Sequence, residues 1–163
     1  VNMTTTLAIA AEFIQEGVKK SGIPLTHALE AYLSITFSRY FDKSIEVDRL
    51  TVRITRALDN SAPRDILRNL ADECLIGTAL FERRLERSGR VRHYVGLGQM
   101  TYDAAGMAEQ AYGFVPMMDI LSSNISDTDI NLLLDKAKGG SVTARTKLDN
   151  VVLFKKPSHS VWI

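Results

Sequence analysis

Residues 91–105 hold the densest set of side chains in the chain that could bind a ligand. The stretch contains one histidine, two tyrosines, one aspartate and two closely spaced glycines, and a run of arginines precedes it. Glycines leave space for a ligand, aromatic and sulfur-containing side chains can wall an apolar pocket, and an arginine can bind an anionic group. The candidate ligand-binding residues are Arg90, Arg92, His93, Tyr94, Gly96, Gly98, Met100 and Tyr102.

The two glycines of this stretch do not match a dinucleotide-binding loop. That loop requires a preceding strand and a third glycine, and Met100 or Thr101 stands in the place of the third glycine. In a helix, Gly98, Thr101 and Ala105 share one face, where small residues allow another helix or a ligand to approach closely. Each glycine inside a helix costs about 1 kcal/mol relative to alanine, so we expect a packing or functional reason for the pair.

Five arginines and two glutamates between positions 82 and 92 leave a local surplus of three positive charges. They are Arg83, Arg84, Arg87, Arg90 and Arg92 against Glu82 and Glu86. The cluster could bind phosphates, with Tyr94 stacked on a base. Alternatively, it is a solvated helix end whose arginines pair with the two glutamates. The net charge of the whole chain is +1, which makes nucleic acid the less favoured partner.

Residues for metal or nucleophilic chemistry are sparse. His27 and Glu30 share a helical face at a spacing that metal sites use. A di-metal helical bundle needs two Glu-x-x-His motifs and two further glutamates, whereas this chain has one pair in the reverse order. Cys74 lies on an apolar helical face, where free cysteine is usually inert core material. We therefore predict no catalytic residue, no metal and no cofactor, and a protein that is not an enzyme.

The elements that would position these residues are all helices. Apolar periodicity, caps and breakers predict helices at residues 5–20, 26–40, 44–60, 61–87, 91–110, 114–121, 126–138 and 141–150. A strand competes at residues 44–60, but its alternation breaks in the middle. The helical reading separates Val47, Leu50 and Ile54 from three arginines on the opposite side, with Val52 as a misfit. We predict a single all-α domain, a bundle of six to eight helices.

Two helices are predicted to form the centre of this bundle. The helix at residues 26–40 is apolar on nearly its whole circumference, and the helix at residues 91–110 would pack beside it. Other core positions are predicted at Leu7, Ala11, Ile14, Val18, Ile66, Leu67, Leu70, Ala71, Cys74 and Leu75. Four methionines are interpreted as core filler rather than as a pocket lining: Met100, Met107, Met117 and Met118.

The composition and the apolar runs of the chain indicate the cellular compartment in which it works. A chain of 163 residues with 45% hydrophobic and 24% charged residues is typical of one globular domain. A single cysteine fits a reducing compartment. Residues 7–11 are too short an apolar run for a secretory signal, and no run approaches the ~18 apolar residues that a membrane span needs. We therefore expect a cytoplasmic protein without a membrane segment, in which residues 1–3 are vector-derived or unstructured.

The C-terminal residues 155–163 are predicted to form an arm. The only tryptophan of the chain, Trp162, lies near its end between Val161 and Ile163. Because a tryptophan ring gains several kcal/mol from burial, we predict that Trp162 is buried, either on its own domain or on a second copy as an exchanged arm. Blue-shifted native fluorescence would support burial.

One group of residues resembles a known set of proteins. The group comprises residues 68–77 (RNLADECLIG), Phe81, residues 94–98 (YVGLG) and Tyr102, about a quarter of the chain. It resembles a set of small uncharacterised bacterial all-helical proteins. The resemblance implies a helical fold and a bacterial source, and it carries over no site residue because no activity is known for that set.

Together these observations favour a non-enzymatic cytoplasmic helical interaction module that binds a protein partner or forms a homo-oligomer. The first alternative is a binding protein for a small apolar or anionic ligand beside Gly96 and Gly98. The second alternative is nucleic-acid binding through the arginine cluster.

Overall fold

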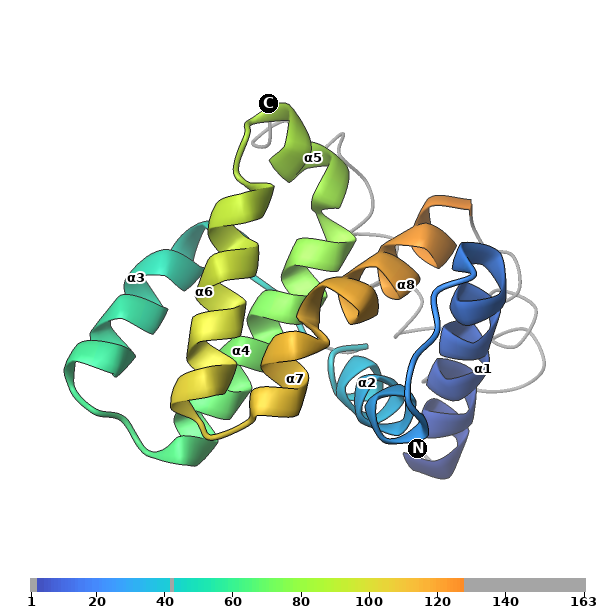
Figure 1. The fold of residues 1–163 in the computed structure, drawn as a ribbon, viewed down its shortest axis with the longest axis horizontal. Coiled ribbons are helices and arrows are strands. Elements are labelled where there is room, and N and C mark those ends of the chain that lie inside the picture. The colour runs from blue at the N-terminus through green and yellow to red at the C-terminus, as the bar shows by residue number, and fades with distance from the viewer. Residues whose placement is uncertain (1–2, 42, 128–163) are drawn as a thin grey trace.

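The computed structural model describes residues 3–41 and 43–127, and these residues form eight α-helices and no strand. The helices are α1 (Met3–Ser21), α2 (His27–Arg39), α3 (Val47–Asp59), α4 (Arg64–Leu80), α5 (Glu82–Arg87), α6 (Val91–Ala104), α7 (Ala108–Tyr112) and α8 (Phe114–Asp127) (Figure 1). The predicted all-α fold is therefore confirmed for this part of the chain. The predictions for residues 128–163, including the arm and the burial of Trp162, lie outside the described residues.

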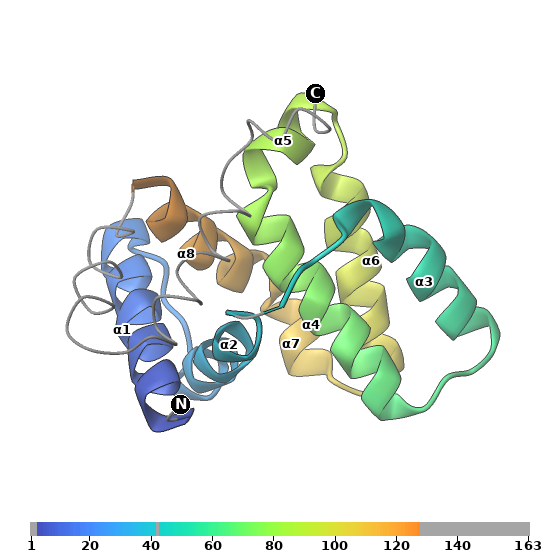
Figure 2. The same ribbon diagram turned by 180° about the vertical axis from the view of Figure 1, so that it is seen from behind.

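Helix α4 lies at the centre of the bundle. It packs against α3, α6 and α8 and lies between α3 at one end of the molecule and α1 and α2 at the other (Figures 1 and 2). All of its residues from Cys74 to Leu80 are buried. The prediction that the helix at residues 26–40 is central is wrong, because α2 packs mainly against α1 and leaves Ala31 and Ile35 exposed. Apolar residues around a helix are covered only where a neighbouring helix is available.

Helix α1 buries a different stripe from the predicted one. Of the predicted stripe, Ile14 is buried, Ala11 and Val18 are only partly buried and Leu7 is exposed. The buried residues are Thr6, Ile9, Ala10, Phe13, Ile14 and Gly17. The reason lies at Gly17, where a Cβ atom would come within 2.6 Å of the Ile120 carbonyl oxygen of α8. This close approach of the two backbones selects the face that includes Ala10 and Gly17. A count of large apolar residues does not detect such a face.

Helix α3 agrees with the helical prediction for residues 44–60. Val47, Leu50 and Ile54 are buried, and the exposed side carries three arginines. Val52, the predicted misfit, is 58% exposed. In the next helix, Ile66 is half-exposed rather than part of the core, because it lines a surface groove between α3 and α4.

Several helix boundaries differ from those predicted. The Thr26 hydroxyl accepts a hydrogen bond from the Leu29 amide at 3.2 Å and caps α2, as predicted. The predicted helix at residues 91–110 is two helices, because Gly106 has φ of +74° and turns the chain between α6 and α7. The predicted helix at residues 61–87 is likewise divided at Phe81, and it begins later than predicted, with Pro63 at its N-cap. Residues 126–127 end α8 instead of beginning a new helix.

None of the helices within residues 3–41 and 43–127 combines the length and the apolarity needed to cross a membrane.

Candidate functional site

Helix α6 places the eight predicted ligand-binding residues on different sides. Tyr94, Gly98 and Tyr102 follow each other at intervals of four and are all buried. The exposed residues are Arg92, His93, Gly96 and Met100, and Arg90 precedes the helix in a partly buried position. The structure therefore does not bring the predicted set together in one pocket, and ligand binding by these residues stays a prediction.

The space beside Gly98 is filled by Phe114 of α8. A Cβ atom added at Gly98 would lie 2.2 Å from the Phe114 ring, whereas one added at Gly96 would meet nothing within 4 Å. The absence of a side chain at Gly98 thus allows α8 to pack on α6. Met107, Met117 and Met118 are buried as predicted, and Met100 is half-exposed, so the core interpretation holds for three of the four methionines.

The arginine cluster is anchored by an acid from another helix. Arg84 and Arg90 both lie 3.1 Å from one carboxylate oxygen of Asp48 in α3. The guanidinium carbon of Arg84 is also 5.1 Å from the Phe81 ring centroid, and burial lowers the pKa of this arginine. The predicted pairing with the neighbouring glutamates is wrong for Glu82, which accepts a hydrogen bond from Ser122.

Arg83, Arg87 and Arg92 remain exposed, so part of the predicted positive surface is used for packing rather than presented to solvent. The histidine beside this cluster also joins helices, since His93 Nε2 lies 2.8 Å from the Thr51 hydroxyl of α3.

A buried carboxylate that the sequence analysis missed lies where α2, α4 and α6 meet. Asp72 is 1% exposed, and its Oδ1 atom accepts hydrogen bonds from the hydroxyls of Tyr102, at 2.6 Å, and Tyr32. The Arg39 guanidinium approaches the other oxygen, Oδ2, to 3.8 Å, and no described residue donates a hydrogen bond to that oxygen. Burial raises the pKa of Asp72, although the tyrosine hydrogen bonds oppose this effect.

This cluster contains the side chains that an acid–base site needs, but the protein encloses them, so a substrate does not reach them. Tyr102 is fully buried, and the aromatic ring of Tyr32 packs edge-on against it at 6.3 Å between centroids. A substrate would have to enter the helix junction to reach the carboxylate. We interpret the cluster as the polar contact that fixes the three helices relative to one another. The sequence feature that could have indicated this cluster is Asp72 itself, an aspartate within a largely apolar stretch of the helix.

Cys74 is also enclosed. Its thiol lies 3.2 Å from the Tyr94 carbonyl oxygen, to which it donates, and burial raises the pKa of the thiol to about 12. A thiol with such a pKa is not a nucleophile near neutral pH. Among the described residues, no group of three histidine, cysteine or acidic side chains is arranged to hold a metal ion.

A groove of about 400 Å³ runs between α3 and α4. Its polar residues are Arg53, Arg56, Asn60, Asn69 and Glu73, and its apolar residues are Ala57, Ala62, Ile66 and Leu70. The sequence analysis missed it because Ile66 was assigned to the core and the arginines of α3 to a solvated face.

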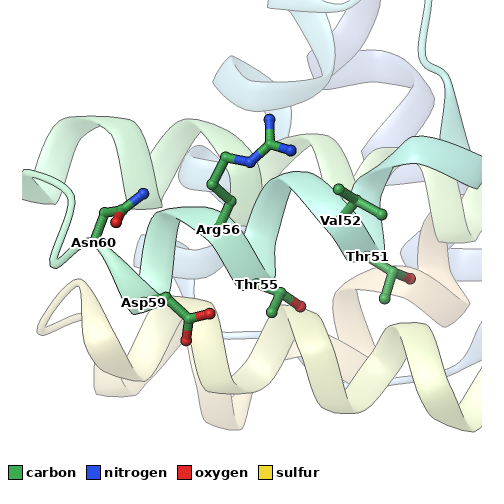
Figure 3. Close-up of a pocket in the computed structure, with 6 residues that line it drawn as sticks. All are labelled: Thr51, Val52, Thr55, Arg56, Asp59 and Asn60. Atoms are coloured by element: carbon green, nitrogen blue, oxygen red, sulfur yellow. The ribbon is translucent and has the colours of Figure 1, made fainter.

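A second hollow, of about 420 Å³, lies along the outer side of α3 and shares Arg56 and Asn60 with the groove. Figure 3 shows its residues spread along one helix, with Arg56 and Asp59 pointing to opposite sides. We refer to the two hollows together as the α3 surface. Apolar side chains, arginines and concave shape occur together on this surface.

No model of a known protein family, no curated protein and no solved structure matches this chain. The interpretation of the site therefore depends on its geometry and chemistry.

Proposed function

We propose that this protein is a non-enzymatic bacterial interaction module of the cytoplasm, and that it self-associates through the outer side of α3. The observation that carries the proposal is Val52, an apolar side chain that is 58% exposed in the hollow on the outer side of α3. A second copy that covered this valine would bury apolar surface that the single chain leaves in water.

The position of α3 supports this proposal. The helix packs mainly against α4 and α6 and forms one end of the molecule, with its other side open to solvent (Figures 1 and 2). Thr51, Thr55 and Arg56 line the same hollow as Val52, and Arg56 points to the same side of α3 as Val52 (Figure 3). Arginine is enriched in protein interfaces, so Arg56 beside an exposed apolar side chain suits a contact with a second copy.

The burial of the side chains that could support catalysis favours a binding function over an enzymatic one. Asp72, Tyr102 and Cys74 are all enclosed in the core. The α3 surface presents hydroxyl, amide and guanidinium groups, which suit recognition.

Sedimentation velocity of the full chain at high micromolar concentration tests the proposal. We expect a dimer or larger assembly for the wild type and a monomer for Val52→Glu, because a carboxylate at this position would be desolvated without a partner. Ile35→Glu is the matched control, since Ile35 is also an exposed apolar residue, 44% accessible, but belongs to α2. A monomeric wild type, or equal masses for both variants, would overturn self-association through α3.

A further inference from the structure

The groove between α3 and α4 has a closed end and a defined length. Arg53 of α3 donates two hydrogen bonds, of 2.6 and 3.2 Å, to the two carboxylate oxygens of Glu73 of α4. This pair joins the helices across the groove, and the loop after Asn60 bounds the other end. Residues 53 and 60 are about 10 Å apart along α3, so the groove matches a small molecule better than a long peptide.

The floor of the groove is apolar and incompletely covered. Ala57, Ala62 and Leu70 lie beneath it, and the side chain of Ile66 is 50% exposed beside them. The volume of about 400 Å³ falls within the range of small-molecule sites. A compact apolar group placed here would cover Ile66 and displace water from the floor.

The charge of the groove indicates which charge a ligand should carry. Two arginines and one glutamate line it, so its formal charge is one positive. Arg53 is neutralised by Glu73. The side chain of Arg56 makes no ion pair or hydrogen bond with any described residue, so its guanidinium is free to bind one anionic group.

A carboxylate fits this guanidinium better than a phosphate does. A guanidinium binds a carboxylate through two parallel hydrogen bonds, and one negative charge balances one positive charge. A doubly charged phosphate would exceed the single positive formal charge of the groove by one charge.

We propose that the groove between α3 and α4 binds a small organic monocarboxylate with a compact apolar body. The carboxylate binds Arg56 and the body lies on Ile66. This site does not use Val52, although Arg56 and Asn60 border both hollows.

Nuclear magnetic resonance titration of the ¹⁵N-labelled full chain tests the site, with 4-phenylbutyrate as the probe. We expect saturable shifts of amide signals in residues 53–73. The neutral isostere 4-phenylbutyramide should bind roughly tenfold more weakly, because it loses the charged hydrogen bonds to Arg56. Acetate, which has no apolar body, should show no saturation in the same range.

Two substitutions provide the decisive comparison. Arg56→Gln should weaken 4-phenylbutyrate binding roughly tenfold, as the amide probe does. Arg49→Gln is the matched control, because Arg49 is exposed on the same helix but pairs with Glu46 at 3.1 Å outside the groove. Equal affinity for the acid and the amide, an unchanged affinity of Arg56→Gln, or shifts confined to other helices would each overturn the proposal. Stronger binding of phenyl phosphate than of 4-phenylbutyrate would overturn the assignment to carboxylates.

Discussion

The Asp72 carboxylate connects side chains from three helices and is itself enclosed. Burying a charged carboxylate is costly unless hydrogen bonds and opposite charge compensate. Here two tyrosine hydroxyls and Arg39 provide that compensation. Removing one of these donors should therefore lower the free energy of unfolding more than removing a hydroxyl from the surface does.

We predict that Tyr102→Phe lowers the free energy of unfolding by about 1–3 kcal/mol at pH 7, because the variant removes a hydrogen bond to a buried charge. Urea denaturation followed by circular dichroism measures the change. Tyr112→Phe is the control, since Tyr112 is 89% exposed and its hydroxyl stays in water. Equal stability of the two variants would contradict a role for the hydroxyl of Tyr102.

The loss of stability caused by Tyr102→Phe should also depend on pH. Burial raises the pKa of Asp72 above its ordinary value of 3.8, so the folded chain holds this proton more tightly than the unfolded chain does. Between 3.8 and the raised pKa, the contribution of Asp72 to stability therefore increases as the pH falls. A hydrogen bond to a neutral carboxyl is weaker than one to a carboxylate, so the Tyr102→Phe penalty should be smaller at pH 4 than at pH 7. A penalty that grows on acidification would contradict this assignment.

Among the elements, α6 and α8 illustrate how one glycine sets a helix packing distance. Phe114 is fully buried and its ring occupies the volume where a side chain at Gly98 would lie. The neighbouring Gly96 faces open space on the same helix. Each glycine therefore costs the helix a similar free energy relative to alanine, but only Gly98 is needed for the contact with a neighbouring helix.

We predict opposite effects of alanine at these two positions. Gly98→Ala should lower the free energy of unfolding by about 1–3 kcal/mol, because Phe114 must move from a packed site. Gly96→Ala should raise it by about 0.4–1 kcal/mol, because alanine favours the helix and meets no neighbour. Thermal unfolding of both variants compares them directly. A stabilising effect at Gly98 would mean that the Phe114 ring is free to yield.

For the whole molecule, α4 joins two groups of helices that have few direct contacts. One group contains α3 and α6, and the other contains α1, α2 and α8 (Figure 2). α4 contacts α3 and α6 of the first group and α8 of the second, and its residues from Cys74 to Leu80 are all buried. α3, in contrast, has three buried residues and lies at an edge.

This arrangement predicts a gradient of local stability. Backbone amides in residues 74–80 should exchange with solvent only through global unfolding, whereas those of α3 should exchange through local opening at a lower free energy. Native-state hydrogen exchange at low denaturant concentrations measures both. Equal exchange free energies for α3 and α4 would show that the edge helix is as tightly coupled as the centre.

The sequence by itself determined the helical content and the two-sided character of α3. A 3.6-residue apolar period with opposed arginines is local information, and Thr26 and Gly89 mark helix ends through backbone chemistry that needs no distant partner. Such features follow from residues within one or two turns of each other.

Only the tertiary structure decided which helix is central, which glycine is a contact and which acids pair with which bases. Asp48 binds Arg84 and Arg90 across 36 and 42 positions of the chain, and Asp72 meets Tyr32 and Tyr102 across 40 and 30. The groove between α3 and α4 likewise depends on two helices placed side by side. Sequence periodicity describes one helix at a time, and these contacts depend on the relative positions of helices that are distant in the chain.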